Sequence, residues 1–284
     1  MSLATIFRQP ITTASDHHAS ATSGRIISCW GSVGGGKTTL SVNLAFELAS
    51  LGKSVLLVDA DSHRPAIAST LGLVDAGPGI TAILRLARSE RLDISELERL
   101  SEEISFSSTS LRVVTGINAP SRWPELDSHG LSEFLKFSRE QFDFTVFDVA
   151  TELETGLYSQ TSDTSRNFAS SEILSNSDQV LGVFAADPVG VNRFLWDLRE
   201  ASFEFWPVAN RVRSSVLGRN PERQLRDTMF RIAQLKLHSL IPEDSAALDV
   251  SQQRAHPLLL AAKTAKAREA IRLIAVELLD ELAN

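Results

Sequence analysis

The chain has 284 residues, of which 43% are apolar and 22% are charged, and its net charge is −7. This composition is that of an ordinary globular protein and argues against a wholly disordered, collagenous or coiled-coil chain. The negative charge argues against nonspecific affinity for nucleic acid over the whole surface, although it leaves room for a local basic patch. Cys29 is the single cysteine, so one chain can form no internal disulfide and no cysteine-ligated iron–sulfur cluster.

The first 24 residues differ in composition and periodicity from the rest of the chain. They are rich in Ser, Thr, Ala and His without a sustained period, which predicts a flexible leader over residues 1–24. His17 and His18 within it are interpreted as tail residues rather than metal ligands. The start of the chain lacks the basic and apolar stretches of a secretory signal, and no apolar run approaches the roughly 18 residues that span a bilayer. We therefore expect a cytoplasmic protein without a transmembrane segment.

Residues 25–284 alternate short apolar runs with helical patterns, which is typical of a parallel sheet with crossover helices. The predicted fold class is α/β, a doubly wound, mostly parallel sheet flanked by helices and built as one domain. The predicted strands are residues 25–30, 54–58, 111–115, 144–148, 179–184, 206–210 and 237–241. The predicted helices are residues 38–51, 81–103 with breaks, 130–141, 190–203, 221–235 and 264–282.

A glycine-rich motif follows the first predicted strand and opens the first predicted helix. It fits the pattern G-x-x-x-x-G-K-[ST], and its residues with the next one are Gly31, Ser32, Val33, Gly34, Gly35, Gly36, Lys37, Thr38 and Thr39. Glycines let the backbone wrap phosphates, and the N–H groups at the helix N-terminus meet their charge. Lys37 is suited to the β- and γ-phosphate oxygens of ATP, and Thr38 to Mg²⁺. The motif predicts a P-loop nucleotide site; the alternative is a turn that only caps a helix.

The chain resembles the ParA/MinD group of deviant Walker ATPases from about residue 25 to its C-terminus. Four segments carry the resemblance. They are GSVGGGKTTLSVNLAFELASLGKSVLLVDAD at residues 31–61, FDFTVFDVA at 142–150, VANRVR at 208–213, and LIPED at 240–244 with the helical region after it. The segment LRVVTGINAPSRWPEL, residues 111–126, is similar to the CpaE/TadZ-like branch, which is tied to pilus and secretion-system positioning.

The resemblance implies roles for three carboxylates. Asp61 would orient the attacking water, while Asp59 and Asp148 would arrange the Mg²⁺ shell. All three follow predicted strands, and ligands bind at the carboxyl ends of parallel strands. The alternative for each is a helix N-cap or turn residue. By the same resemblance Asn210 reads the adenine edge and Pro242 packs near the ring, or Asn210 is a plain turn residue.

The chain departs from the family at the P-loop. Family members carry a second lysine after the first motif glycine, which reaches the partner's phosphates across a nucleotide-sandwich dimer; here that position is Ser32, followed by Val33. Because a cation at the γ-phosphate contributes strongly to rate, we expect weak ATP hydrolysis or a substitute cation. The candidate substitutes are Arg64 and Arg166, each of which is otherwise a surface arginine. The family proline after the second acidic strand is also missing, since Val149 and Ala150 stand there.

Three other features carry weaker expectations. Residues 211–236 hold seven basic side chains and could bind DNA, as the corresponding region of ParA proteins does, or form a solvated face. The apolar stripe of the last helix is expected to pack in the core rather than on a membrane; it comprises Ile271, Ile274, Leu278 and Leu282. Trp123 and Trp196 are interpreted as packing aromatics.

The resemblance implies an ATP-dependent dimerising switch that positions or partitions a cellular cargo. It would act as a homodimer when ATP is bound, and this dimer would recruit a protein partner. The protein itself would work in the cytoplasm, either free or peripherally at a membrane-associated machine or a cell pole. The first alternative is a nucleotide-binding scaffold with little turnover, which Ser32 favours. The second is a DNA-partitioning ATPase. A tyrosine-kinase relative is disfavoured because Tyr158 is the single tyrosine.

Overall fold

A computed structural model describes residues 23–73, 77, 79–153 and 165–281. Eight strands form one sheet in the order β3-β4-β2-β5-β1-β6-β7-β8. Every neighbouring pair is parallel except the β3–β4 hairpin, which is antiparallel. The strands are β1 (Arg25–Gly31), β2 (Val55–Ala60), β3 (Glu102–Phe106), β4 (Thr109–Val114), β5 (Phe144–Val149), β6 (Gln179–Ala185), β7 (Trp206–Val212) and β8 (Ser239–Pro242).

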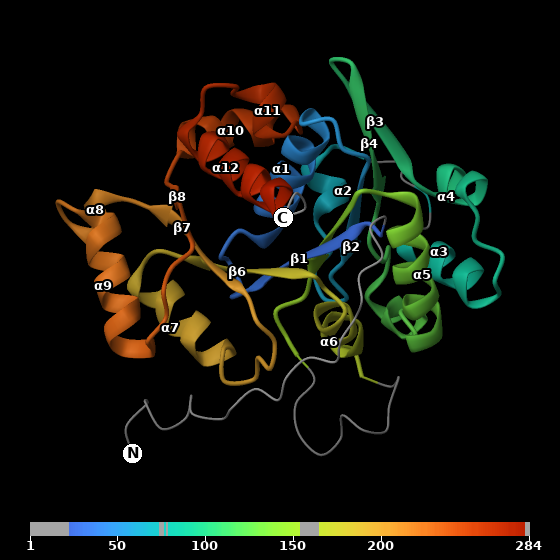
Figure 1. Cartoon of the computed structure of the whole chain (residues 1–284), viewed down its shortest axis with the longest axis horizontal. Helices are drawn as coiled ribbons and strands as arrows, with labels where there is room; N and C mark the ends of the chain where they lie inside the picture. Colours follow the sequence, from blue (N-terminus) through green and yellow to red (C-terminus); the bar gives the residue numbers. More distant parts are fainter. Residues whose placement is uncertain (1–22, 74–76, 78, 154–164, 282–284) are drawn as a thin grey trace.

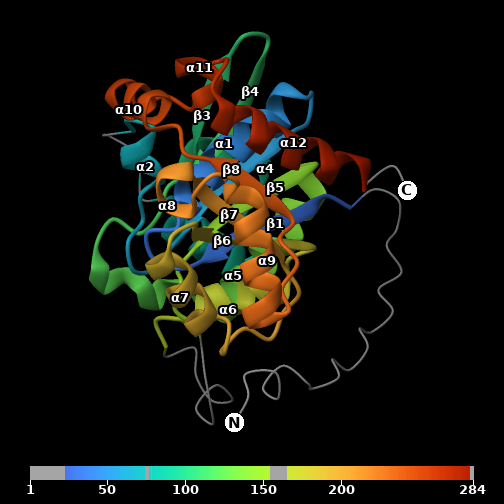
Figure 2. The same ribbon diagram turned by 90° about the vertical axis from the view of Figure 1, so that its left-hand side faces the viewer.

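Helices cover both faces of the sheet, as the two perpendicular views show (Figures 1 and 2). On one face lie α1 (Lys37–Ser50), α2 (Ile67–Thr70), α10 (Ser245–Arg254), α11 (Leu258–Ala261) and α12 (Lys266–Asp280). On the other lie α3 (Gly79–Arg88), α4 (Ile94–Leu100), the 3₁₀ turn η2 (Pro120–Glu125), α5 (Ser128–Gln141), α6 (Phe168–Ser175), α7 (Pro188–Asp197), α8 (Ser214–Leu217) and α9 (Pro221–Ala233). The expected α/β class is confirmed.

The central strands are buried on both faces, which explains their continuous apolar runs. Strands β2 and β5 are buried along their whole length, and β1 from its second residue onward. Two hydrophobic clusters result, one on each side of the sheet. The last helix contributes to the α1 side with Ile271, Ile274 and Leu278, all at most 2% exposed. Its predicted core packing is confirmed for these three residues, whereas Leu282 lies outside the described part.

Three expectations are wrong. The segment 81–103 is not a broken helix throughout, because Glu102 and Glu103 begin the antiparallel edge strand β3 after α4 has ended. Trp196 does not pack in the core: it is 65% exposed, with Arg199 stacked 4.6 Å above its ring. The leader is predicted to run to residue 24, yet Gly24 already donates a backbone hydrogen bond to Arg139 O and is tied to α5.

The rest of the leader, with His17 and His18, lies outside the described residues, as does Tyr158. Trp123 in η2 is half-buried and packs against the core, as expected. Within the described residues, none of the helices has both the length and the apolar character to cross a membrane.

Candidate nucleotide-binding site

The P-loop joins β1 to α1 at the carboxyl edge of the sheet. Gly31 has φ 138° and Gly36 has φ 96°, conformations that L side chains rarely adopt. A Cβ on Gly31 would lie 2.1 Å from the carbonyl oxygen of Val183, and one on Gly36 would lie 2.3 Å from Nδ2 of Asn210. Gly31 is therefore required both by its conformation and by the backbone of Val183, whereas Gly36 is required by its conformation.

The two departures from the family motif behave differently. Ser32 is 1% exposed, and its Oγ is a buried polar atom without a hydrogen-bond partner in the described part of the chain. Val33 is 45% exposed and is not among the described residues with a left-handed φ, so a β-branched side chain fits where the family has glycine. Ser32 is thus a short, buried, uncharged side chain and supplies no cation to the loop.

The start of α1 faces the end of β5. Thr38 Oγ1 donates to Oδ2 of Asp148 over 2.5 Å, and Ser41 Oγ lies 3.2 Å from Oδ1 of the same carboxylate. Lys37 Nζ donates to Thr151 Oγ1 over 2.7 Å. Thr39 is half-buried in the same turn, and its carbonyl accepts from Asn43. A hydroxyl, a carboxylate and an ammonium group therefore converge below the loop.

Asp59 stands opposite Asp148 in the register of β2 and β5. Both are fully buried, and this burial is the main cause that raises the pKa of each carboxyl above its usual value. The charge of Asp148 raises the pKa of Asp59 further, while Thr38 and Lys37 oppose the rise at Asp148. Two neighbouring buried acids are an electrostatic cost that a cation would relieve.

The oxygen donors here suit Mg²⁺, which takes one or two protein carboxylates together with phosphate and water oxygens. In the described ranges no cluster of three or more His, Cys, Asp or Glu could hold a metal without such additional ligands. Asp59 accepts backbone hydrogen bonds from Ala66 and Ile67 at Oδ2, and from Asp61 at Oδ1. Asp59 therefore also anchors the loop after β2.

Asp61 lies at the start of that loop and is half-buried. Its Oδ1 accepts from the backbone N–H groups of His63 and Arg64, both over 2.8 Å. This geometry is that of a turn carboxylate. The role predicted for Asp61, orienting a water, thus remains a prediction, as does the alternative turn role.

The loop after β2 is joined to the segment before α6. Arg166 donates from Nε and Nη2 to the carbonyl of Ser62, at 3.0 and 2.8 Å, and Ser62 Oγ donates back to the carbonyl of Arg166 over 2.7 Å. His63 Nε2 lies 2.8 Å from Oδ1 of Asn167. We call these contacts the 62–167 clasp. Arg166 is thus held against Ser62, the residue after Asp61, whereas Arg64 is exposed.

Asn210, at the carboxyl end of β7, lies against the P-loop. Its Nδ2 donates to the carbonyl of Gly35 over 2.8 Å, and its Oδ1 accepts from the N–H of Arg211. Pro242 ends β8 opposite Val212 and is half-buried. Base reading by Asn210 and packing by Pro242 remain predictions.

Sequence reasoning missed three residues near this site, namely Ser41, Thr151 and Asp197. Ser41 follows Lys37 by one helical turn, a spacing that could have indicated a shared face. Asp197, at the end of α7, is half-buried, and burial raises its pKa to about 6 against the opposing charge of Lys37. No sequence signal links Asp197 to the P-loop.

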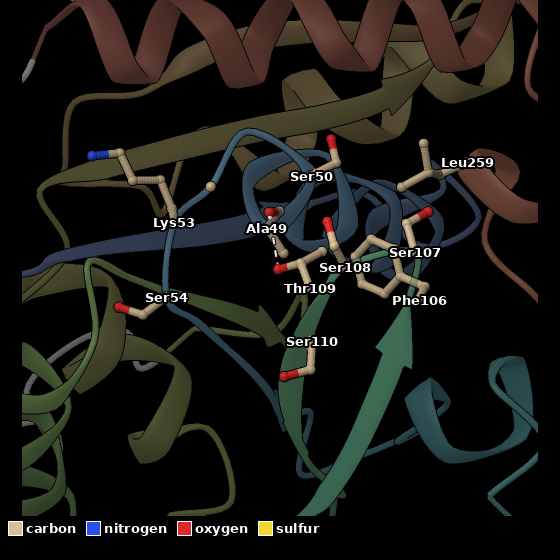
Figure 3. Close-up of a pocket in the computed structure, with 11 residues that line it drawn as sticks. Ala49, Ser50, Lys53, Ser54, Phe106, Ser107, Ser108, Thr109, Ser110 and Leu259 are labelled. Atoms are coloured by element: carbon tan, nitrogen blue, oxygen red, sulfur yellow. Dashed lines mark hydrogen bonds between the residues drawn. The ribbon is translucent and has the colours of Figure 1, made fainter.

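A separate hollow of about 630 Å³ lies between the far end of α1 and the β3–β4 hairpin (Figure 3). Ser50, Lys53, Phe106, Thr109 and Leu259 are among its lining residues. Since α1 runs from Lys37 to Ser50, about 20 Å of helix separates the hollow from the P-loop. It is not part of the candidate site.

Comparisons with known proteins agree with this geometry. Residues 26–257 match the family described as the CobQ/CobB/MinD/ParA nucleotide binding domain. The septum site-determining protein MinD of Synechocystis sp. is 25% identical over 239 residues, covering 82% of this chain and 80% of that protein.

Solved structures share the fold. A ParA family ATPase from Chlorobium tepidum superposes with a TM-score of 0.74 at 17% identity, covering 90% of this chain and 99% of that one. The cell division ATPase MinD of Pyrococcus furiosus gives 0.68 at 23% identity, covering 90% and 99%. MinD of Pyrococcus horikoshii, solved with Mg-ADP, gives 0.65 at 20% identity, covering 92% and 98%. The family match spans the strands and loops that build the site, and the chain belongs to the CobQ/CobB/MinD/ParA nucleotide-binding family.

Proposed function

We propose that the protein is an ATP-dependent dimerising switch that positions or partitions a cellular cargo. The observation that supports it most directly is the contact of Thr38 Oγ1 with Asp148 at 2.5 Å, beneath a glycine loop and beside the ammonium group of Lys37. That arrangement joins a phosphate cradle to an oxygen-rich cation site. Residues 25–284 would form the single domain that carries it.

In this proposal the backbone of residues 31–36 and the first turn of α1 hold the phosphates. Lys37 neutralises the β- and γ-phosphate oxygens, and Thr38 with Asp148, helped by Asp59, holds Mg²⁺. Bound ATP supplies a γ-phosphoryl group that passes to water, a reaction that depends mainly on positioning and charge neutralisation. Asp61 orients that water, and Asn210 with Pro242 lines the base.

The cargo is inferred from similarity alone. The LRVVTGINAPSRWPEL segment, residues 111–126, favours the CpaE/TadZ-like branch and hence pilus or secretion machinery. The relatives named as septum-site proteins favour a division or chromosome site. In either case the protein would work in the cytoplasm or peripherally at a membrane-associated machine or cell pole, with a protein partner that the ATP-bound dimer recruits. A MinD of Aquifex aeolicus has been solved in complex with MinC.

A nucleotide-binding scaffold with little turnover is the second candidate, and Ser32 is the observation that favours it. Its buried side chain cannot extend toward a second subunit as a lysine would. Without another cation at the γ-phosphate, hydrolysis would be slow while binding through Lys37 persisted.

A DNA-partitioning ATPase is the third candidate. Exposed arginines on and before α9 within residues 211–236 support it, namely Arg219, Arg223, Arg226 and Arg231. Two of the arginines in residues 211–236 form ion pairs within the protein, Arg223 with Asp227 and Arg213 with Glu243. These pairs reduce the positive charge that the region could offer to DNA.

ATP turnover and Mg-ATP binding, measured on wild type, Ser32→Ala and Ser32→Lys, test the proposal. We expect micromolar-range or tighter Mg-ATP binding in wild type and Ser32→Ala, slow turnover in both, and faster turnover in Ser32→Lys. Failure of wild type to bind Mg-ATP would overturn the proposal. Binding with no measurable turnover in any of the three would favour the scaffold.

A further inference from the structure

Thr151 lies three residues after Asp148 and is 8% exposed. Its Oγ1 accepts a hydrogen bond from Lys37 Nζ over 2.7 Å and donates one to the carbonyl of Gly31 over 2.7 Å. Its own carbonyl accepts from the indole Nε1 of Trp30 over 2.9 Å. The roles proposed above do not use this residue, although it contacts both ends of the P-loop.

The hydrogen bonds fix the direction of the Thr151 hydroxyl. A threonine hydroxyl has one proton, and here that proton is used on Gly31, so lone pairs face the ammonium group. The carbonyl is fixed as well, because the ring of Trp30 is fully buried and packs edge-on against Phe203 with centroids 5.1 Å apart. Thr151 is therefore tied to β1 at two points and presents a fixed acceptor to Lys37.

A neutral acceptor suits the P-loop lysine. The lysine side chain has considerable rotamer freedom, which binding must remove. Thr151 restricts that freedom but uses only one of three N–H donors and leaves the positive charge intact. Among the described residues no carboxylate forms an ion pair with Lys37, although Asp148 and Asp197 lie near enough to affect it electrostatically.

We propose that Thr151 is a positioning residue that holds the ammonium group of Lys37 in place before nucleotide binds. Its hydrogen bond links Lys37 to the second residue after the end of β5. The link to ATP affinity rests on the proposed function; the positioning itself is a property of the nucleotide-free chain.

The first test needs no nucleotide. Acetic anhydride labels lysines, and peptide mass spectrometry gives the rate at Lys37 relative to Lys53, which lines the distant hollow. In Thr151→Val the shape is kept but the hydroxyl is lost. We expect Lys37 to react about fivefold faster, the factor that corresponds to one lost hydrogen bond. Thr151→Ser, which keeps the hydroxyl, should restore the wild-type rate.

Thr109→Val is the matched control, because Thr109 is a half-buried threonine in the hairpin far from the P-loop. It should leave the Lys37 rate unchanged. If Thr151→Val does not fold, Thr151→Ala makes the same prediction, since it also lacks the hydroxyl. An unchanged Lys37 rate in a folded variant without the hydroxyl would overturn the inference.

Calorimetry with Mg-ATP separates this inference from the proposed function. We expect Thr151→Val to bind Mg-ATP about fivefold more weakly than wild type and Thr151→Ser to recover the affinity. If wild type bound no ATP while labelling changed as expected, the proposed function would fail and the positioning role would stand. If wild type bound ATP and labelling did not change, only the positioning role would fail.

Discussion

Two loops at the carboxyl edge of the sheet, residues 31–36 after β1 and residues 61–66 after β2, are held in different ways. The first is fixed by its own backbone, with left-handed glycines pressed against Val183 and Asn210. The second is fixed by side chains, those of Asp59 and Asp61 and the 62–167 clasp. The backbone conformation of the first loop persists whether or not a ligand is bound. The side-chain hydrogen bonds of the second loop can be replaced by hydrogen bonds to a ligand. We therefore expect the loop at residues 31–36, called the cradle below, to stay fixed, and the loop at residues 61–66, called the switch loop, to be able to exchange its contacts.

Loss of the lysine at the cradle should have the largest effect. Lys37→Ala removes the cation expected to make at least two charge-assisted hydrogen bonds to phosphate oxygens, each worth about 1.5–3 kcal/mol. Calorimetry should show Mg-ATP affinity reduced about 100-fold or more, with unchanged far-UV circular dichroism. Lys53→Ala is the control and should bind as wild type. Equal affinity in wild type and Lys37→Ala would refute the assignment of this loop.

At the switch loop, Asp61→Ala should abolish turnover and leave binding in place. Removing a positioned proton-transfer or water-orienting group typically costs about 100-fold or more in rate, while Lys37 and Thr38 are untouched. Phosphate release and calorimetry measure the two effects, and the ATP-bound assembly should become long-lived. Asp93→Ala, which removes a comparable backbone cap on distant α4, should alter neither. A small stability change without loss of turnover would show that Asp61 is only a turn residue.

The clasp should distinguish the two candidate arginines. Arg166→Ala removes two hydrogen bonds to the carbonyl of Ser62, so we expect a loss of about 1–3 kcal/mol in the free energy of unfolding together with slower turnover. Exposed Arg64→Ala should change stability by less than about 0.5 kcal/mol and leave turnover unchanged. Urea titration and phosphate release measure both. If wild type turned over rapidly and both variants were silent, the argument from the missing lysine would be wrong.

The smallest effect should come from Asp197, which lies near enough to Lys37 for the lysine to oppose the rise in its pKa. Burial raises its folded pKa to about 6, above the value near 4 expected when unfolded, so its ionised form opposes folding. That penalty is nearly absent below pH 4, grows between pH 4 and 6, and is fully present above pH 6. Asp197→Asn should therefore be more stable than wild type at pH 7.5 by about 1 kcal/mol, a figure already reduced for partial exposure.

At pH 4 wild type and Asp197→Asn should differ much less in unfolding temperature, because the carboxyl is then protonated in the folded protein and about half protonated in the unfolded chain. Thermal unfolding at the two pH values provides the comparison. A difference that is larger at pH 4 than at pH 7.5 would contradict the assigned direction of the pKa shift.

The cradle was predictable because its constraints are local in sequence. Gly31, Gly36 and Lys37 fall in one short motif, and the acids Asp59 and Asp148 each end an apolar strand. Parallel strands place such residues at one edge of the sheet. The structure then sets these two acids opposite each other in register.

The contacts of the second loop were not predictable from local pattern. Arg166 and Ser62 are 104 positions apart, and Thr151 and Lys37 are 114 apart. Such pairs depend on tertiary folding and leave no periodic signal. The error at Trp196 was avoidable, because the buried positions Gly190, Phe194 and Leu198 recur every fourth residue and put Trp196 on the opposite face of α7.

The measurement that tests the switch most directly is the mass of the wild-type protein in solution with ATP, with ADP and without nucleotide. Light scattering on the size-exclusion peak gives it. Because the γ-phosphate would make contacts that ADP lacks and so favour the assembled state, we predict a dimer with ATP and a monomer in the other two conditions. The same mass in all three conditions, whether monomer or dimer, would contradict a nucleotide-dependent switch; a constant dimer would favour the scaffold.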